Sequence, residues 1–100
     1  ERIPDRTRGD HVVTISAIVI HPDDTVACLL RDHPAGECAF LPTGRTAALH
    51  SDTPLGHKIA LVATALGAPV IKFGAVIGHA TADISPGEHV HLHNLQGGLR

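Results

Sequence analysis

Histidine is the residue type most able to do chemistry in this chain, and three of the nine histidines lie at alternate positions: His89, His91 and His93. In an extended strand, side chains two positions apart share a face and lie about 6.6–6.8 Å apart at their bases. Two such imidazoles can tilt toward one metal ion, but a third in line cannot easily join them. The pattern predicts a metal pair, His89 and His91, completed by His21 or His57. The plainer interpretation is the polar face of an edge strand.

Two shorter patterns also contain groups that move protons or bind anions. Gly56-His57-Lys58 places an imidazole beside a cation suited to a substrate carboxylate. His21 and Asp24 flank a turn, where the carboxylate can orient the imidazole. The plainer interpretations are a loop-to-strand junction and a turn cap. The other histidines and one glutamate show no partner in the sequence and are interpreted as surface residues: His11, His33, His50, His79 and Glu88.

The composition indicates that short strands must position these residues. The chain is 43% hydrophobic, with frequent Val, Ile and Thr and with no Met, Trp or Tyr. Such a composition favours strands over helices, and the ten Gly and seven Pro mark many turns. We therefore predict an all-β domain with one modest core. Its expected extent is residues 12–96, between a flexible arm (1–11) and a short tail (97–100).

Alternation and turn residues predict eight strands: 12–20, 25–30, 37–41, 45–49, 59–62, 69–73, 76–83 and 88–95. The first two form a hairpin, as do the next two, around Pro42-Thr43-Gly44. Residues 63–68 form a helical turn or a loop, and Gly78 indicates a bulge or a close backbone approach. The last strand places Val90 and Leu92 opposite its three histidines. No internal repeat is evident.

Charge and cysteine content exclude several function classes. The net charge is −2 and the eight Lys and Arg are dispersed, so a nucleic-acid partner is not expected. Cys28 and Cys38 lack a CxxC arrangement and fit reduced thiols. No apolar run approaches the roughly 20 residues of a membrane span, and the polar start is unlike a signal peptide. We therefore expect a cytoplasmic location without membrane contact.

Taken together, several motifs in this order resemble the SAF domain of the altronate and galactarate dehydratase family. They are Ile20-His21-x-x-Asp24-x-Val26-Ala27, Pro34-Ala35-Gly36, Pro54-Leu-Gly-His57-Lys58-Ile-Ala-Leu61, Val70-Ile-Lys-Phe-Gly74, Ile77-Gly78 and Ala82-Asp-Ile-Ser-Pro-Gly-Glu-His-Val-His-Leu-His-Asn94. The resemblance spans residues 18–95 and implies a β-clip fold of short kinked strands. Sulfolactate sulfo-lyases, which use a separate small subunit of about this size, are close relatives.

The resemblance implies a lyase that acts by β-elimination on a hydroxy acid, such as a sugar acid. A base removes the proton α to a carboxylate, a divalent metal stabilises the enediolate, and an acid releases the leaving group. The metal is Fe²⁺ or Mn²⁺, held mainly by a large catalytic subunit or domain, so this chain alone is expected to be inactive. The residues implied are His21, Asp24, His57 and Lys58 for catalysis, and His89, His91, His93 and Asn94 for substrate binding.

Some positions depart from the family pattern, and other functions stay open. Thr25 and Phe73 stand where the family usually has a polar asparagine and a tyrosine, which leaves the exact substrate undetermined. Ala63 and Leu66 stand where relatives often have charged residues, which changes the surface toward a larger partner. SAF-like domains also serve as non-catalytic binding or assembly modules. Metal storage or sensing by the histidines is a third possibility. The chain is also compatible with a homo-oligomer.

Overall fold

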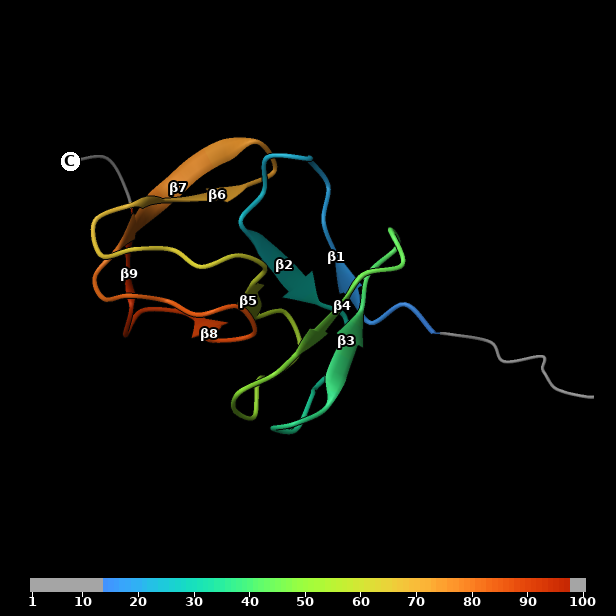
Figure 1. The fold of residues 1–100 in the computed structure, drawn as a ribbon. Coiled ribbons are helices and arrows are strands. Elements are labelled where there is room, and N and C mark those ends of the chain that lie inside the picture. Colours follow the sequence, from blue (N-terminus) through green and yellow to red (C-terminus); the bar gives the residue numbers. More distant parts are fainter. Residues whose placement is uncertain (1–13, 98–100) are drawn as a thin grey trace, which may run out of the picture.

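Nine short strands in three antiparallel sheets form the part of the chain that the structure, a computed structural model, describes: residues 14–97 (Figure 1). The central sheet has the order β1-β2-β5-β8, beside the hairpin β3-β4 and the sheet β6-β7-β9. The all-β prediction is confirmed. The strands are β1 Ala17–Ile18, β2 Val26–Leu29, β3 Cys38–Phe40, β4 Thr46–Ala48, β5 Lys58–Ala60, β6 Pro69–Lys72, β7 Ala75–Ala80, β8 His89–Val90 and β9 Leu95–Gly97.

Four turns of one type start four of these strands. Each has a hydrogen bond from the N–H of its fourth residue to the carbonyl of its first, and each has a glycine at its third position. The glycine φ angles are 84°, 84°, 83° and 87°, which is the type II geometry that glycine adopts without strain. The turns span 34–37, 54–57, 65–68 and 85–88, just before β3, β5, β6 and β8.

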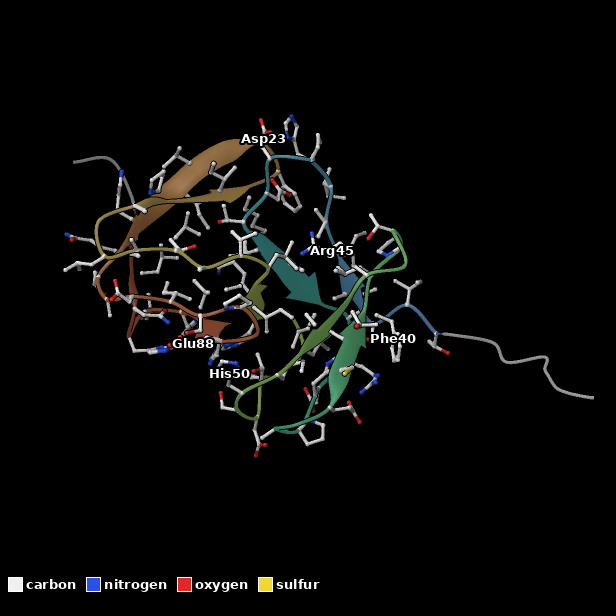
Figure 2. All side chains as sticks on the ribbon, in the orientation of Figure 1. Asp23, Phe40, Arg45, His50 and Glu88 are labelled. Carbon is white, nitrogen blue, oxygen red and sulfur yellow. The ribbon has the colours of Figure 1, made fainter. Side chains whose placement is uncertain are left out.

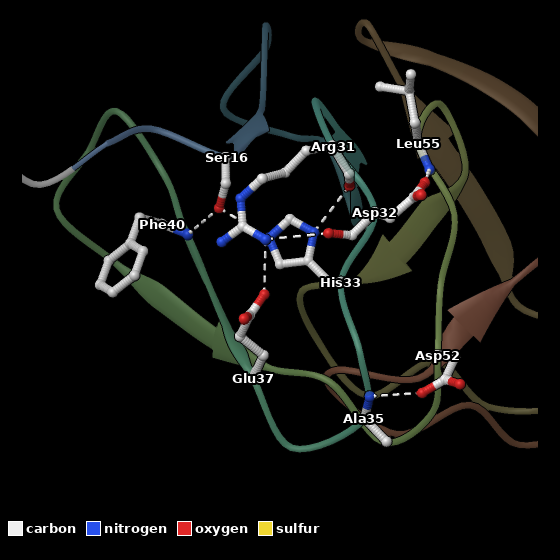
Figure 3. Close-up of polar contacts among 9 residues, drawn as sticks. All are labelled: Ser16, Arg31, Asp32, His33, Ala35, Glu37, Phe40, Asp52 and Leu55. Atoms are coloured by element: carbon white, nitrogen blue, oxygen red, sulfur yellow. Dashed lines mark hydrogen bonds and ion pairs between the residues drawn. The ribbon is translucent and has the colours of Figure 1, made fainter.

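The loops that carry the first two turns hold each other by reciprocal hydrogen bonds (Figure 3). Asp52 accepts a hydrogen bond from the N–H of Ala35 at 2.8 Å, and Asp32 accepts one from the N–H of Leu55 at 2.7 Å. Between them, His33 and Thr53 form an isolated antiparallel bridge. The carboxylates therefore serve as fixed acceptors for backbone groups at the tips of the partner turns.

The same arrangement recurs thirty-one positions later, where Ala63 and Asp83 stand in the places of Asp32 and Asp52, with one bond fewer. Thr64 and Ile84 form the bridge, and Asp83 accepts from the N–H of Leu66 at 2.9 Å. The return bond is absent from this loop pair because Ala63 has no carboxylate and Pro86 has no N–H to donate. The prediction that the chain has no internal repeat is therefore wrong, since its hydrogen bonding repeats even though few residue types do.

The central sheet separates two hydrophobic clusters, whereas one core was predicted. Successive residues of β5 point to opposite sides: Ile59 belongs to one cluster and Ala60 to the other, and both are fully buried. Burying an isoleucine of this kind contributes about 1.5–3 kcal/mol. The first cluster contains Ala17, Ala27, Leu29, Ala39, Leu41, Leu49, Ile59 and Leu61. The second contains Val26, Ala60, Val70, Ala80, Ile84 and Val90.

Several strand predictions are confirmed and others need correction. Both hairpins form, with β1 paired to β2 and β3 to β4, but the first strand is reduced to Ala17–Ile18 within the described residues. Residues 63–68 form a loop rather than a helical turn. A Cβ at Gly78 would lie 2.3 Å from the carbonyl oxygen of Gln96, which confirms the close backbone approach. The predicted arm, 1–11, lies outside the described residues, and β9 includes Gly97 of the predicted tail.

His33, predicted to be a surface residue, is fully buried in a hydrogen-bond network (Figure 3). Its Nδ1 lies 2.9 Å from the Arg31 carbonyl, which can only accept, so Nδ1 carries the proton. Its Nε2 lies 2.9 Å from the Ser16 hydroxyl, which therefore donates to the ring while accepting from the N–H of Phe40 at 3.0 Å. One imidazole thus connects three segments of backbone. The sequence gives no local sign of this role.

We expect His33→Ala to lower the free energy of unfolding by about 2–4 kcal/mol, because it leaves the Ser16 hydroxyl and the Arg31 carbonyl without a partner and opens a cavity. Urea unfolding followed by circular dichroism measures this change. The exposed His50 provides the matched control, since His50→Ala should change stability by less than about 0.5 kcal/mol. Equal stability of the two variants would contradict the structural role of His33.

Candidate functional site

Three histidines from two segments, the turn before β5 and the region of β8, meet at one place. Nδ1 of His57 lies 2.8 Å from Nε2 of His89, a hydrogen bond in which one ring donates and the other accepts. The His57 ring also stacks on that of His91, with centroids 4.4 Å apart. One ring nitrogen from each histidine lies within 4.8 Å of the other two. The predicted pair, His89 and His91, is therefore joined by His57 and not by His21.

Strand register brings His57 to His89. Lys58 pairs with Val90 and Ile59 with His89 across the antiparallel β5–β8 ladder, so the residue just before β5 lies close to β8. On the other side, the His57 carbonyl accepts a hydrogen bond from the N–H of Leu29 at 2.9 Å. The type II turn at 54–57 ends at His57, which donates its N–H to the Pro54 carbonyl at 3.1 Å. The backbone of His57 is thus held on both sides.

The final strand differs from its prediction. It ends at Val90, and 91–94 form a turn, so the three histidines do not share one face of a strand. Leu92, predicted to lie beside Val90, is 83% exposed, while Val90 is buried. The turn nevertheless folds His91 back over His57, and the ring of His93 lies 5.5 Å from that of His89. The histidines gather through a tight turn, which strict alternation does not predict.

Asn94, predicted to bind substrate, is buried and holds this turn closed. Its Oδ1 accepts from the N–H of His91 at 2.9 Å, and its Nδ2 donates to the carbonyl of His89 at 2.8 Å. Its own N–H donates to the His91 carbonyl at 3.0 Å. An asparagine side chain that mimics a backbone turn in this way is common in tight turns. Asn94 therefore acts here as a positioning residue for the histidines.

The environment lowers the pKa of two of these imidazoles below the usual 6.5. For His89 the main cause is desolvation by burial, followed by the charge that His57 would carry if protonated. For His91 desolvation is again first, followed by His57 and by Lys58. Both rings are therefore mainly neutral near pH 7, and neutral imidazoles can accept a proton or bind a metal ion.

Lys58 lies beside the cluster but occupies the next position along β5. Its neighbours across the two ladders are Cys28 and Val90, and its side chain is half-buried. Its positive charge acts on both His89 and His91, as their lowered pKa values indicate. The cluster thus has the cation of Lys58 next to it, and this charge acts on the two imidazoles whose pKa is lowered.

His21 and Asp24 lie elsewhere, in the turn between β1 and β2. That turn precedes Val26, which pairs with Ala60, so it is at the end of the β2–β5 ladder away from His57. Figure 2 shows Asp23, in the same turn, well separated from Glu88, which precedes β8. The structure therefore does not bring His21 and Asp24 to the histidine cluster.

Asp24 binds backbone groups and does not bind the His21 imidazole. Its carboxylate accepts from the N–H of Gly74 at 2.8 Å and from that of His21 at 3.2 Å, which joins the turn to the β6–β7 hairpin. Burial raises the pKa of this carboxyl, but these and neighbouring backbone hydrogen bonds outweigh burial and lower it below 3.8. The His21 ring instead accepts from the N–H of Asp23 at 3.1 Å. The geometry is that of a turn cap.

Two open clefts, of about 380 and 400 Å³, lie at the two repeated loop pairs. None of the clustered histidines lines either cleft. The first is lined by Asp32, His33, Pro34, Asp52, Thr53 and Pro54, and the second by Ala63, Thr64, Ala65, Asp83, Ile84 and Ser85. Their equivalent positions indicate that both clefts are products of the repeated architecture.

Comparison with known proteins decides the family. The model of the altronate/galactarate dehydratase SAF domain matches residues 15–98. The chain belongs to this SAF domain family. The SAF domain is 45% identical to altronate dehydratase of Escherichia coli over 82 residues, and 42% identical to altronate dehydratase of Bacillus subtilis over 84 residues.

A second group of relatives is shorter. Over 46 residues, the SAF domain is 48% identical to the alpha subunit of (2R)-sulfolactate sulfo-lyase from Paracoccus pantotrophus. That match covers 46% of this chain and 69% of the subunit. By contrast, the alignments with the two altronate dehydratases cover 82% and 84% of this chain but only 16% and 17% of the length of those enzymes.

In residues 14–97, the structure has no helix long and apolar enough to cross a membrane.

We expect His89 and His91 of the SAF domain to titrate below pH 6.5 when imidazole signals are followed by NMR. Because the unfolded chain binds these protons more readily than the folded one, stability should fall as the pH drops below about 6.5. His57→Ala should raise both pKa values, since it removes a neighbouring like charge. The exposed His79 gives the control variant, His79→Ala. A wild-type His89 pKa at or above 6.5 would contradict the arrangement.

We expect Asn94→Ala to lower the free energy of unfolding by about 1–3 kcal/mol, because buried backbone groups lose their side-chain partner. Asn94→Asp should cost less, since it keeps the acceptor for the N–H of His91 and loses the donor to the His89 carbonyl. Urea unfolding measures both, and NMR line widths report whether His91 becomes mobile. If Asn94→Ala left stability and the His91 signal unchanged, the positioning role would be rejected.

Proposed function

We propose that this SAF domain is the accessory part, a small subunit or N-terminal domain, of a metal-dependent lyase that eliminates a β-substituent from a hydroxy acid. Relatives named altronate dehydratase and sulfolactate sulfo-lyase support the reaction class. The short span of the altronate dehydratases that the chain covers supports a large catalytic subunit or domain as its partner. A cytoplasmic location, without nucleic-acid or membrane partners, is part of the same proposal.

The observation that carries the proposal is the cluster of three imidazoles, two of which have a lowered pKa, next to a lysine. In a β-elimination, one group must donate a proton to the departing hydroxyl, and a neutral imidazole can pass a proton in either direction near pH 7. A hydroxy-acid substrate also carries a carboxylate, which a fixed cation binds. His57, His89 and His91 offer the imidazoles, and Lys58 offers the cation.

In this proposal His57 protonates the leaving group and Lys58 binds the substrate carboxylate. The 2.8 Å contact with His89 fixes the orientation of the His57 ring. His91 and the exposed His93 extend this face toward the substrate. His21 and Asp24 support the fold at the far turn and have no part in the proposed chemistry.

A divalent metal, Fe²⁺ or Mn²⁺, belongs to the proposed reaction and is held mainly by the larger part. Imidazole nitrogen suits iron and related transition metals, so the donor set of the cluster fits such an ion. His89 and His91 are the ligands that the SAF domain would contribute. When bound, the ion would stabilise the negative charge that develops on the substrate after proton removal.

Two substrate classes follow from the two groups of relatives. Altronate or another sugar acid would lose water, whereas sulfolactate would lose sulfite. The second class is favoured by the alpha subunit of sulfolactate sulfo-lyase, of which this chain matches 69%. Both substrates present a carboxylate and a hydroxyl to the same set of residues.

The test is reconstitution of the SAF domain with the larger lyase polypeptide, followed by assays of altronate and sulfolactate with Fe²⁺. We expect no turnover by either part alone and turnover by the mixture. His57→Ala should lower kcat/KM about 10²-fold or more, because a positioned proton donor contributes about 10²–10⁴-fold to the rate. Lys58→Ala should raise KM more than it lowers kcat, provided that it binds the carboxylate equally in the ground and transition states.

His79→Ala serves as the matched control, since His79 is exposed on β7 and should leave the rate unchanged. Full turnover by the SAF domain alone would reject the accessory role. Equal rates for the wild type and for His57→Ala in the reconstituted enzyme would reject the assignment of His57.

A further inference from the structure

We infer that His57, His89 and His91 form a three-nitrogen site for a divalent transition-metal ion that the SAF domain binds by itself, without the larger part. The inference rests on the proposed function only for what the ion does in the reaction. Its binding follows from residues of this chain and extends the predicted pair, His89 and His91, by a third ligand, His57, from the turn before β5. The SAF domain rather than the larger part would then supply most of the protein ligands of this ion.

The separations between the nitrogens suit one ion. Metal–nitrogen bonds of about 2.0–2.1 Å in a tetrahedral site place the ligand nitrogens about 3.3 Å from one another. In the chain, His57 Nδ1 and His89 Nε2 are 2.8 Å apart, and all three ligand nitrogens lie within 4.8 Å. Shifts of about 1.5 Å or less in side-chain positions therefore reach the metal geometry. Small rotations of the rings suffice for this.

Backbone hydrogen bonds already fix the main chain of all three histidines. His57 donates to Pro54 and accepts from Leu29. The His89 carbonyl and the His91 N–H both bind the side chain of Asn94. Such outer contacts orient metal ligands and reduce the entropy lost on binding.

The donor set selects the class of ion and leaves room for a further ligand. Three imidazoles suit Fe²⁺, Co²⁺, Ni²⁺ or Zn²⁺ better than Mg²⁺ or Ca²⁺, which prefer oxygen. Three protein ligands also leave at least one position open, as in catalytic rather than structural sites. The half-buried rings leave that position accessible to water, to a substrate oxygen or to a group from the larger part.

The experiment titrates the full 100-residue chain with Zn²⁺ by calorimetry and with Co²⁺ by visible absorption. We expect one ion per chain and a Co²⁺ spectrum with nitrogen ligation. His57→Ala, His89→Ala and His91→Ala should each weaken binding about tenfold or more, since each removes one of three ligands. His79→Ala and His50→Ala, both at exposed positions, should leave affinity unchanged. Thermal unfolding without metal checks that each variant is folded, and His57→Gln replaces His57→Ala if that variant is not.

Unchanged affinity in folded His57 or His91 variants would overturn the inference, as would an equal loss in His79→Ala. The inference and the proposed function can fail separately. If the chain binds Co²⁺ through the three histidines but the reconstituted protein has no lyase activity, the metal site stands and the proposed function fails. If the reconstituted lyase needs Fe²⁺ but the chain alone binds no ion, the inference fails and the proposed function stands.

Discussion

The pairing of β5 on both of its edges is the constraint on which the rest of the structure depends. Ile59 lies between Ala27 of β2 and His89 of β8. Because β5 is central, its side chains supply both hydrophobic clusters, one on each side of the sheet. The same pairing sets the distance between His57 and His89. The core and the candidate site are therefore fixed by one strand of three residues, and a shift in its register would disrupt both.

Local sequence patterns predicted the parts of the fold that depend on neighbouring residues. The two hairpins follow from turn chemistry. The strand predicted at 59–62 follows from an apolar run, of which Ile59, Ala60 and Leu61 are buried and Val62 is 41% exposed. The all-β class followed from composition. The final strand was wrong because alternation cannot detect a side chain such as Asn94 that competes with the strand by closing a turn.

Non-local contacts explain what the sequence could not show about the site and the core. His33 binds Ser16, seventeen positions earlier, so nothing near it in sequence marks it as buried. His57 was one of two candidates for the third ligand position, and only the β5–β8 register selects it over His21. By contrast, the resemblance to the SAF domain family was readable from sequence because it rests on many motifs in a fixed order. Family membership alone does not place side chains.

The unequal closure of the two loop pairs has a consequence for motion. The first pair has two hydrogen bonds from backbone N–H groups to carboxylates, and the second has one. The second bond of that pair is missing because Ala63 has no carboxylate to accept it and Pro86 has no N–H to donate it. Fewer contacts lower the free energy of local opening. The second pair contains the turn at 85–88, which leads directly into His89. The domain therefore has a firmer loop pair, which contains His33 and ends at His57, and a more compliant pair, which leads into His89 and where amide exchange with solvent will be faster.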